Sequence, residues 1–328
     1  MKPICKLTML AFLAIPMGLQ AQSHRPQSDF TTDTLMTHDP VMAYEKGTYH
    51  VFSTGIGLQH ATSKDLKKWT VKATTAMSVI PKWTHDSVPG FRNHVWAPDI
   101  IRYKDKWWMA YSCSTFGKNT SAIGLLSARS LDAGETWSDQ GAIVCSQEGR
   151  DNWNAIDPNF IIDDNGEPWL TFGSFWDGIQ LVKLDTTMHI AKGQKMKTIA
   201  RRKHVNDMEN PVEAPFIFKH GGYYYLFVSW DYCCQGMKGT YKVVVGRSRN
   251  IGGPYLDRNG KDMADLGGSL VIEGDKKVFE AAGHCSAYSY QGKDYFLCHG
   301  YSVALKGASI LICKEISWTE DGWPTLKD

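Results

Sequence analysis

The chain has 328 residues, of which 36 are basic and 34 acidic, so its formal net charge is only +2. This balance gives no electrostatic basis for nucleic-acid binding, which favours a clear excess of positive charge. Aromatic residues make up 12% of the chain, 12 of them Trp, and long amphipathic helical patterns are missing, which favours an all-β fold with a sugar-binding surface.

The N-terminus predicts a secretory signal. Two lysines precede an apolar run at 7–19, Pro16 interrupts that run, and Ala21 offers a small residue at the cut. The run is shorter than the ~20 residues that a membrane-spanning helix needs, and no cysteine near the cut could accept a lipid. We therefore expect removal of residues 1–21, a secreted or periplasmic protein without a membrane anchor, and a single domain over 22–328.

One unit recurs along the chain: an acidic residue near a proline, a short apolar strand, a hairpin turn and an aromatic strand. Its five copies lie at 38–54, 96–112, 156–174, 212–229 and 283–301. Their leading residues are separated by 60, 58, 56 and 71 positions, about the length of a four-stranded blade. The repeat predicts a five-bladed β-propeller.

The residues that lead the five copies carry chemistry. They are Asp39, Asp99, Asp157, Glu213 and His284. Because the first strand of each blade lines the axis of a propeller, we expect these side chains to converge at one mouth of the channel. An Asp-Pro step can also do no more than mark a strand start, but four copies placed in one register favour a common site.

Clustered carboxylates shift one another's pKa values apart, which separates an acid from a base, and glycoside hydrolysis needs both. Aromatic residues near these acids could form platforms for sugar faces. The candidates are Trp96, Phe116, Trp153, Phe175 and Trp176. A single Trp is more often a core residue, and Trp96, directly before Ala97-Pro98-Asp99, is the strongest candidate.

Motifs taken together and in order resemble glycoside hydrolase family 43, and within it the arabinanases. They are HDP (38–40), WAPDI (96–100), STFG (114–117), SAIG (121–124), NAIDPN (154–159), GSFW (173–176), VEAPF (212–216) and DYCCQG (231–236). The resemblance runs from about Thr37 to the C-terminal region. It implies a five-bladed propeller that cleaves α-1,5-L-arabinofuranosyl linkages of plant cell-wall arabinan with inversion.

The resemblance also implies residue roles. Asp39 matches the general base, Glu213 the general acid, and Asp157 the carboxylate that raises the pKa of the acid and orients acid and substrate. For an inverting enzyme, the carboxyl groups of Asp39 and Glu213 should stand about 6.5–9.5 Å apart. Asp99 is expected to be structural or to contact sugar.

The predicted substrate-binding set combines the carboxylates, the aromatic platforms and the family's sugar-contacting segments. It comprises Asp39, Trp96, Phe116, Gly117, Asn154, Asp157, Ser174, Phe175 and Trp176. His284 matches a histidine that lies beside a metal ion, often calcium, in the channel of related enzymes. The usual GPGH motif is Ala281-Ala282-Gly283-His284 here, which puts the shape of that loop in doubt.

Other functions stay open. The leading hypothesis is an endo-arabinanase, and the alternative within the family is an exo-acting arabinofuranosidase or a β-xylosidase, because loops such as 77–92 and 232–240 decide whether the cleft is open at both ends. A non-catalytic glycan-binding propeller is a further alternative, although such a protein is expected to have lost one of the three acids.

Seven cysteines follow the predicted signal, an odd number, so at least one thiol stays free. Cys233 and Cys234 are adjacent, and no second Cys or His pair stands at zinc-ligand spacing. A vicinal disulfide and two reduced thiols are both compatible with the sequence.

Overall fold

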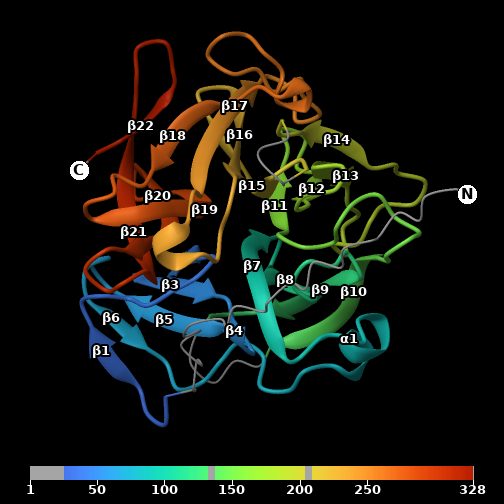
Figure 1. Cartoon of the computed structure of the whole chain (residues 1–328). Coiled ribbons are helices and arrows are strands. Elements are labelled where there is room, and N and C mark those ends of the chain that lie inside the picture. The colour runs from blue at the N-terminus through green and yellow to red at the C-terminus, as the bar shows by residue number, and fades with distance from the viewer. Residues whose placement is uncertain (1–25, 132–136, 204–208, 328) are drawn as a thin grey trace, which may run out of the picture.

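Five antiparallel sheets stand around a central axis in the computed structural model, which describes residues 26–131, 137–203 and 209–327 (Figure 1). The predicted all-β, five-bladed propeller is confirmed. The predicted signal segment, residues 1–21, lies outside the described residues. Among the described residues, the helices are too short and too polar to cross a bilayer.

The blades follow one another in chain order. Blade 1 consists of β1 (Phe30–Thr32), β2 (Val41–Glu45), β3 (Thr48–Ser53), β5 (Gln59–Ser63) and β6 (Trp69–Val71). Blade 2 consists of β4 (Gly55–Ile56), β7 (His94–Tyr103), β8 (Lys106–Cys113), β9 (Ser121–Ala128) and β10 (Ser138–Ser146). Blade 3 consists of β11 (Asn159–Ile162), β12 (Pro168–Phe172), β13 (Ile179–Lys183) and β14 (Lys197–Ala200).

The last two blades have four strands each. Blade 4 consists of β15 (Val212–His220), β16 (Tyr223–Trp230), β17 (Lys242–Ser248) and β18 (Ser269–Glu273). Blade 5 consists of β19 (Phe279–Tyr290), β20 (Lys293–Ser302), β21 (Ala308–Trp318) and β22 (Pro324–Leu326). The helices are α1 (Lys82–Ser87), η1 (Gly236–Lys238) and η2 (Met263–Asp265).

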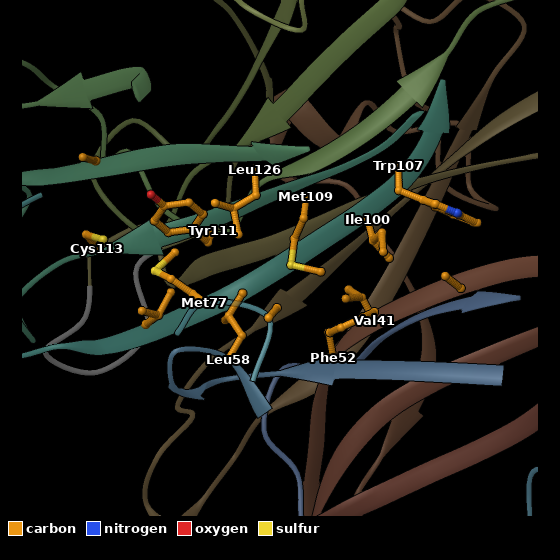
Figure 2. Packing of buried hydrophobic residues seen from close by; sticks show 14 of the residues in the cluster. Val41, Phe52, Leu58, Met77, Ile100, Trp107, Met109, Tyr111, Cys113 and Leu126 are labelled. Carbon is orange, nitrogen blue, oxygen red and sulfur yellow. The ribbon is translucent and has the colours of Figure 1, made fainter. Parts of the chain in front are cut away.

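Apolar side chains of neighbouring blades form the core, so each blade is buried on both faces. Alternate residues of a strand point to opposite faces. Val41 and Ala43 therefore join blade 2 in one cluster, seen in Figure 2 with Met109, while Met42 between them packs toward blade 5. Because both faces need apolar residues, the inner strands carry nearly continuous apolar runs.

The ring closes between the start of the chain and blade 5. The segment before β2 pairs with β21: Met36 bridges Ile310, the amide of Thr37 donates to the carbonyl of Ser309 at 3.2 Å, and that of Leu311 to Leu35 at 2.9 Å. Closure therefore places residues 35–37, and the acid that follows them, against the last blade.

Candidate active site

One strained residue lies in or just before the innermost strand of every blade: two residues before β2 and β11, and at a register irregularity within β7, β15 and β19. These non-glycine residues with positive φ are Asp39 (56°), Ala97 (41°), Asp157 (57°), Ala214 (52°) and His284 (51°). A proline follows the first four. The predicted common register of the acids is therefore wrong for two copies: Asp99 stands two residues after the strained position of blade 2, and Glu213 one residue before that of blade 4.

The backbone amides of three strained residues donate hydrogen bonds to hydroxyl side chains at the end of the second strand of the preceding blade. The amide of Ala97 donates to Thr54 Oγ1 (2.8 Å), that of Asp157 to Ser112 Oγ (3.0 Å) and that of His284 to Ser229 Oγ (2.8 Å). Blade 3 has Gly173 where the neighbouring blades place such a side chain, and the Ala214 amide donates instead to Asp157 Oδ2 at 3.1 Å. Asp157 is thereby fixed beside Glu213.

Asp99 lies in the core and not at the channel mouth. It is 1% exposed, and its Oδ2 accepts hydrogen bonds from the Phe160 amide (2.6 Å) and Asn159 Nδ2 (3.2 Å). Burial raises the pKa of Asp99 to about 7. These hydrogen bonds connect blade 2 to blade 3. Of the two roles expected for Asp99, structural support and contact with sugar, the bonds favour the structural role.

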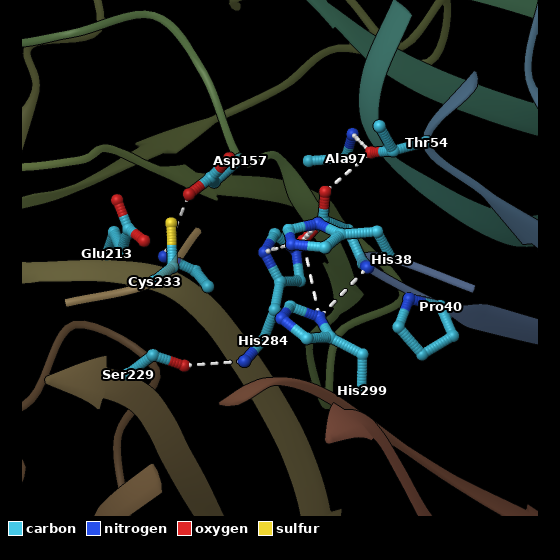
Figure 3. A network of polar contacts seen from close by, with 12 residues as sticks. His38, Pro40, Thr54, Ala97, Asp157, Glu213, Ser229, Cys233, His284 and His299 are labelled. Carbon is cyan, nitrogen blue, oxygen red and sulfur yellow. Dashed lines mark hydrogen bonds and ion pairs between the residues drawn. The ribbon is translucent and has the colours of Figure 1, made fainter. Parts of the chain in front are cut away.

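Asp39 is surrounded by histidines, as Figure 3 shows for the rings of His38, His284 and His299. Its Oδ1 lies 2.8 Å from His38 Nδ1 and 3.0 Å from His284 Nδ1, while Oδ2 accepts from Thr54 Oγ1 at 2.5 Å. Burial alone would raise the pKa of Asp39, but the charges of His284 and His38 outweigh burial and hold it well below its usual range. This carboxylate is therefore ionised.

His299 differs from the other two rings. Its Nδ1 accepts the Asp39 amide hydrogen at 3.1 Å, so its other nitrogen, Nε2, carries the proton and faces Tyr301 OH at 3.2 Å. Burial lowers its pKa well below the usual value. His38, Asp39 and His299 bring possible ligand atoms within 4.8 Å of one another, but the Nδ1 lone pair of His299 is already engaged, so we assign a hydrogen-bonded cluster and not a metal centre.

Glu213 is held on both oxygens. Ser174 Oγ donates to its Oε2 at 2.7 Å and Tyr241 OH to its Oε1 at 2.8 Å. The Cβ of any other residue at Gly283 would stand 2.0 Å from the Tyr241 ring, which explains why this glycine precedes His284. Burial raises the pKa of Glu213 although both donors lower it.

Asp157 completes the acidic pair. Burial raises its pKa to about 8, His284 opposes the rise, and the charge of Glu213 adds to it. Two buried carboxylates that repel each other retain a proton at neutral pH, whereas Asp39 does not. The site therefore holds a protonated acid and an ionised base at the same time, which is what glycoside hydrolysis requires.

The predicted sugar-contacting residues differ in exposure. Phe116 is 67% and Trp176 36% exposed, and Trp96 is half-buried. The side chain of Asn154 is buried and accepts from Ser121 Oγ at 2.7 Å. Trp153 is half-buried and packs edge-on against Phe172 beside the core between blades 2 and 3, so a sugar platform at Trp153 stays a prediction.

Two further residues of the predicted substrate-binding set, Gly117 and Phe175, have a backbone with positive φ. Gly117 has a φ of +73° and open space where a Cβ would stand. Phe175 has a φ of 57°, and its amide donates to the carbonyl of Val212 at 2.9 Å. This bond sets the loop after β12 beside β15, and Ser174 pairs with Glu213 there as an isolated bridge.

Comparison with known proteins agrees with this geometry. Residues 34–324 match the glycosyl hydrolases family 43. The chain belongs to this family. It is 42% identical to the extracellular exo-α-(1→5)-L-arabinofuranosidase ArbA of Cellvibrio japonicus (89% of this chain, 86% of ArbA). It is also 38% identical to the extracellular endo-α-(1→5)-L-arabinanase 1 of Bacillus subtilis (88% of this chain, 87% of that protein).

A solved family 43 structure is closer in sequence. The exo-1,5-α-L-arabinanase from a bovine ruminal metagenomic library is 50% identical, with a TM-score of 0.86 over 90% of this chain and 98% of that one. The match of fold, length and family shows that this chain is a glycoside hydrolase.

Several residues of the site were not singled out from the sequence. Neither Tyr241 nor Thr54, His299 and Tyr301 carries a signal of its own in the sequence. His38 precedes Asp39 in the HDP motif, but a histidine next to an acid in sequence does not by itself predict that their side chains interact. Aligning the prolines of the repeat, rather than the acids, predicts the strained position in four of the five blades; the fifth copy has Cys285 where the others have proline.

Proposed function

We propose that this family 43 enzyme hydrolyses α-1,5-linked L-arabinofuranosyl bonds of arabinan, with inversion. The observation that carries the proposal is the contrast in surroundings of its carboxylates. Asp39 Oδ1 lies 2.8 and 3.0 Å from two histidine nitrogens, which hold its pKa low, while Glu213 and Asp157 are buried, which raises their pKa values. The relatives named above, which act on (1→5)-linked arabinose by their names, support this choice of substrate.

In the proposed reaction, Asp39 takes a proton from the attacking water, and Glu213 gives its proton to the leaving oxygen of the glycosidic bond. Inversion places the two groups on opposite sides of the sugar. Ser174 and Tyr241 fix the orientation of Glu213, and Asp157, held by the Ala214 amide, keeps the pKa of the acid high. Phe116 and Trp176 offer apolar faces to further sugar units.

Product analysis tests the proposal. The protein and its Glu213→Ala variant are incubated with linear arabinan, branched arabinan and xylan, and the products are separated by chromatography. We expect arabinose-containing products from linear arabinan with the unaltered protein alone. Release of xylose only would assign a β-xylosidase, and no product from any glycan would leave a non-catalytic glycan-binding propeller.

The mode of cleavage follows from the same experiment. Our prediction from the sequence is endo action, which releases mixed arabino-oligosaccharides from the start. Exo action is the second candidate, because ArbA and the 50% identical solved structure are both named as exo-acting. A single short product that accumulates from the first time points would identify the exo mode.

We also propose that His284 binds a calcium ion in the channel. Its Nδ1 faces Asp39, and a histidine that ligates a metal usually donates its other nitrogen to such a partner. Burial lowers the pKa of His284, but the charges of Asp39 and the other carboxylates outweigh burial and raise it to about 9, so Nε2 must give up its proton before it binds the metal. Calcium prefers oxygen, so water would complete the shell and the ion would supply positive charge near the carboxylates. We expect calcium to raise the melting temperature of the unaltered protein by about 2–4 °C, but not that of His284→Gln.

A further inference from the structure

The adjacent Cys233 and Cys234 lie in the loop that joins β16 to β17, beside the catalytic carboxylates. Their sulfur atoms are 2.6 Å apart, and both are free thiols. Cys233 packs with Tyr241, Ala281 and Tyr301, and its sulfur feels the charges of Glu213 and Asp39. Cys234 is exposed. One member of the pair is therefore open to solvent, while the other lies next to the site.

Contacts connect this pair to Asp39. The amide of Cys234 donates to Tyr301 OH at 2.6 Å, Tyr301 OH lies 3.1 Å from His38 Nε2, and His38 Nδ1 lies 2.8 Å from Asp39 Oδ1. The Cys234 sulfur itself is 3.9 Å from His38 Nε2. A change in the backbone at Cys234 therefore reaches the predicted base through two side chains.

The pair is chemically asymmetric. The Cys233 thiol donates to the Cys234 sulfur and lowers the pKa of Cys234 to about 5, with a smaller contribution from His38. The same hydrogen bond, together with burial, raises the pKa of Cys233. The exposed sulfur of Cys234 is thus the more acidic of the two and gives the thiolate, the form that attacks disulfides, more readily than Cys233 does.

We propose that Cys233–Cys234 is a modification site, which a small-molecule disulfide converts into a vicinal disulfide that lowers hydrolytic activity reversibly. The Cys234 thiolate attacks one sulfur of the reagent and releases the first thiol. The leaving thiolate takes the proton of Cys233, and the Cys233 thiolate attacks the Cys234 sulfur, which breaks the mixed disulfide and releases the second reagent thiolate, which takes a proton from water. Two protein thiols are oxidised, and one reagent disulfide is reduced to two thiols.

Peptide mass spectrometry tests the site without relying on activity. The protein is treated with oxidised glutathione, then with an alkylating agent, and is digested. We expect a loss of about 2 Da confined to the peptide with Cys233 and Cys234, reversed by dithiothreitol. A persistent glutathione adduct, or two alkylated thiols after treatment, would overturn the proposal. Binding of a trivalent arsenical to the reduced but not the oxidised protein is a second measurement, and it needs no variant.

The activity assay rests on the proposed arabinan hydrolysis. We expect the oxidised protein to lose about tenfold in kcat/KM, because the Cys234 amide no longer positions Tyr301. Cys234→Ser should be insensitive to oxidised glutathione, while Cys313→Ser, which removes a half-buried thiol of β21, should respond like the unaltered protein. A disulfide that forms without changing activity would refute the link to Asp39, whereas absence of activity in every sample would refute only the proposed function.

Discussion

The two ends of the propeller are built differently. At one end, the first two strands of each blade are joined by tight turns, and in Lys46–Gly47, Gly221–Gly222 and Gln291–Gly292 both residues have positive φ, as in type I′ hairpins. At the other end, longer loops follow the second strand, carry exposed apolar residues such as Phe116 and Trp176, and surround the carboxylates. We call these the turn end and the loop end. The turn end stabilises the blades, and the loop end carries the carboxylates of the candidate active site.

This comparison predicts that substitutions at the turn end change stability, whereas those at the loop end change activity. Each experiment below changes a residue at one end, or compares one variant at the turn end with a similar variant at the loop end.

Glu213→Gln should have the largest effect. The amide keeps the shape and can hold either neighbour, but it cannot donate the proton, so kcat/KM should fall by about 10²–10⁴-fold. The melting temperature should stay within a few degrees of that of the unaltered protein. Rates on linear arabinan, measured with circular dichroism as a check of folding, would contradict the role of Glu213 if less than tenfold were lost.

Asp157→Asn should shift the pH profile. A raised pKa keeps the acid protonated below that pKa, and activity is lost as pH rises through it. The Asp157–Glu213 pair holds its last proton because losing it would leave two negative charges side by side in a buried site. A neutral amide at position 157 removes that repulsion, so the alkaline limb of kcat/KM should move to lower pH by about one unit. An alkaline limb that stays in place or moves to higher pH would show that Asp157 does not raise the pKa of the acid.

Tyr241→Phe and Tyr255→Phe form a matched pair across the two ends. Both tyrosines are fully buried donors, Tyr241 to Glu213 at 2.8 Å and Tyr255 to the carbonyl of Ile251 at 2.6 Å, in the connection from β17 to β18 at the turn end. Loss of the first bond should lower kcat about tenfold. Glu213 becomes a carboxylate as it gives up its proton, and hydrogen bonds to charged groups contribute about 1.5–3 kcal/mol, so the bond from Tyr241 strengthens in the transition state.

Loss of the second bond should cost about 1 kcal/mol of stability and leave kcat unchanged. Steady-state kinetics and thermal unfolding on both variants make the comparison. Equal losses of kcat in the two variants would mean that the effect of Tyr241 is one of packing and not of contact with the acid.

Gly222→Ala and Gly117→Ala should give the smallest effects. Both glycines have φ near +75°, and an added Cβ would meet nothing closer than 3.9 Å at Gly222 and open space at Gly117, so each variant should lose about 1–2 kcal/mol of stability from backbone strain alone. Only Gly117→Ala, at the loop end, should also raise KM for arabinan. A raised KM in Gly222→Ala would break the division between the ends.

The turn end could be predicted almost completely from sequence, because its signals are local. Lys46-Gly47 and Gly221-Gly222 stand between two apolar strands, and five such units imply the ring. The apolar runs of the inner strands followed from burial on both faces.

The loop end could be predicted only in part, because its contacts join residues that are distant in the chain. The identities of Asp39, Asp157 and Glu213 followed from motifs, yet the alignment of acids put Asp99 in the wrong register. Tyr241 reaches Glu213 across the loop after β16, and His299 reaches Asp39 from 260 positions away. No periodicity links such pairs, so they emerge only when the ring closes.

The closure of the ring has a consequence for biosynthesis. Asp39 stands near the start of the chain, yet its amide is bound by His299 and its carboxylate by His284, in the blade that the ribosome makes last. A truncated chain that lacks β19 and β20 keeps His38 beside its predicted base but loses His284, whose charge lowers the pKa of Asp39, and His299, which accepts its amide hydrogen. We therefore expect a fragment that ends before blade 5 to be inactive, because its predicted base lacks both contacts.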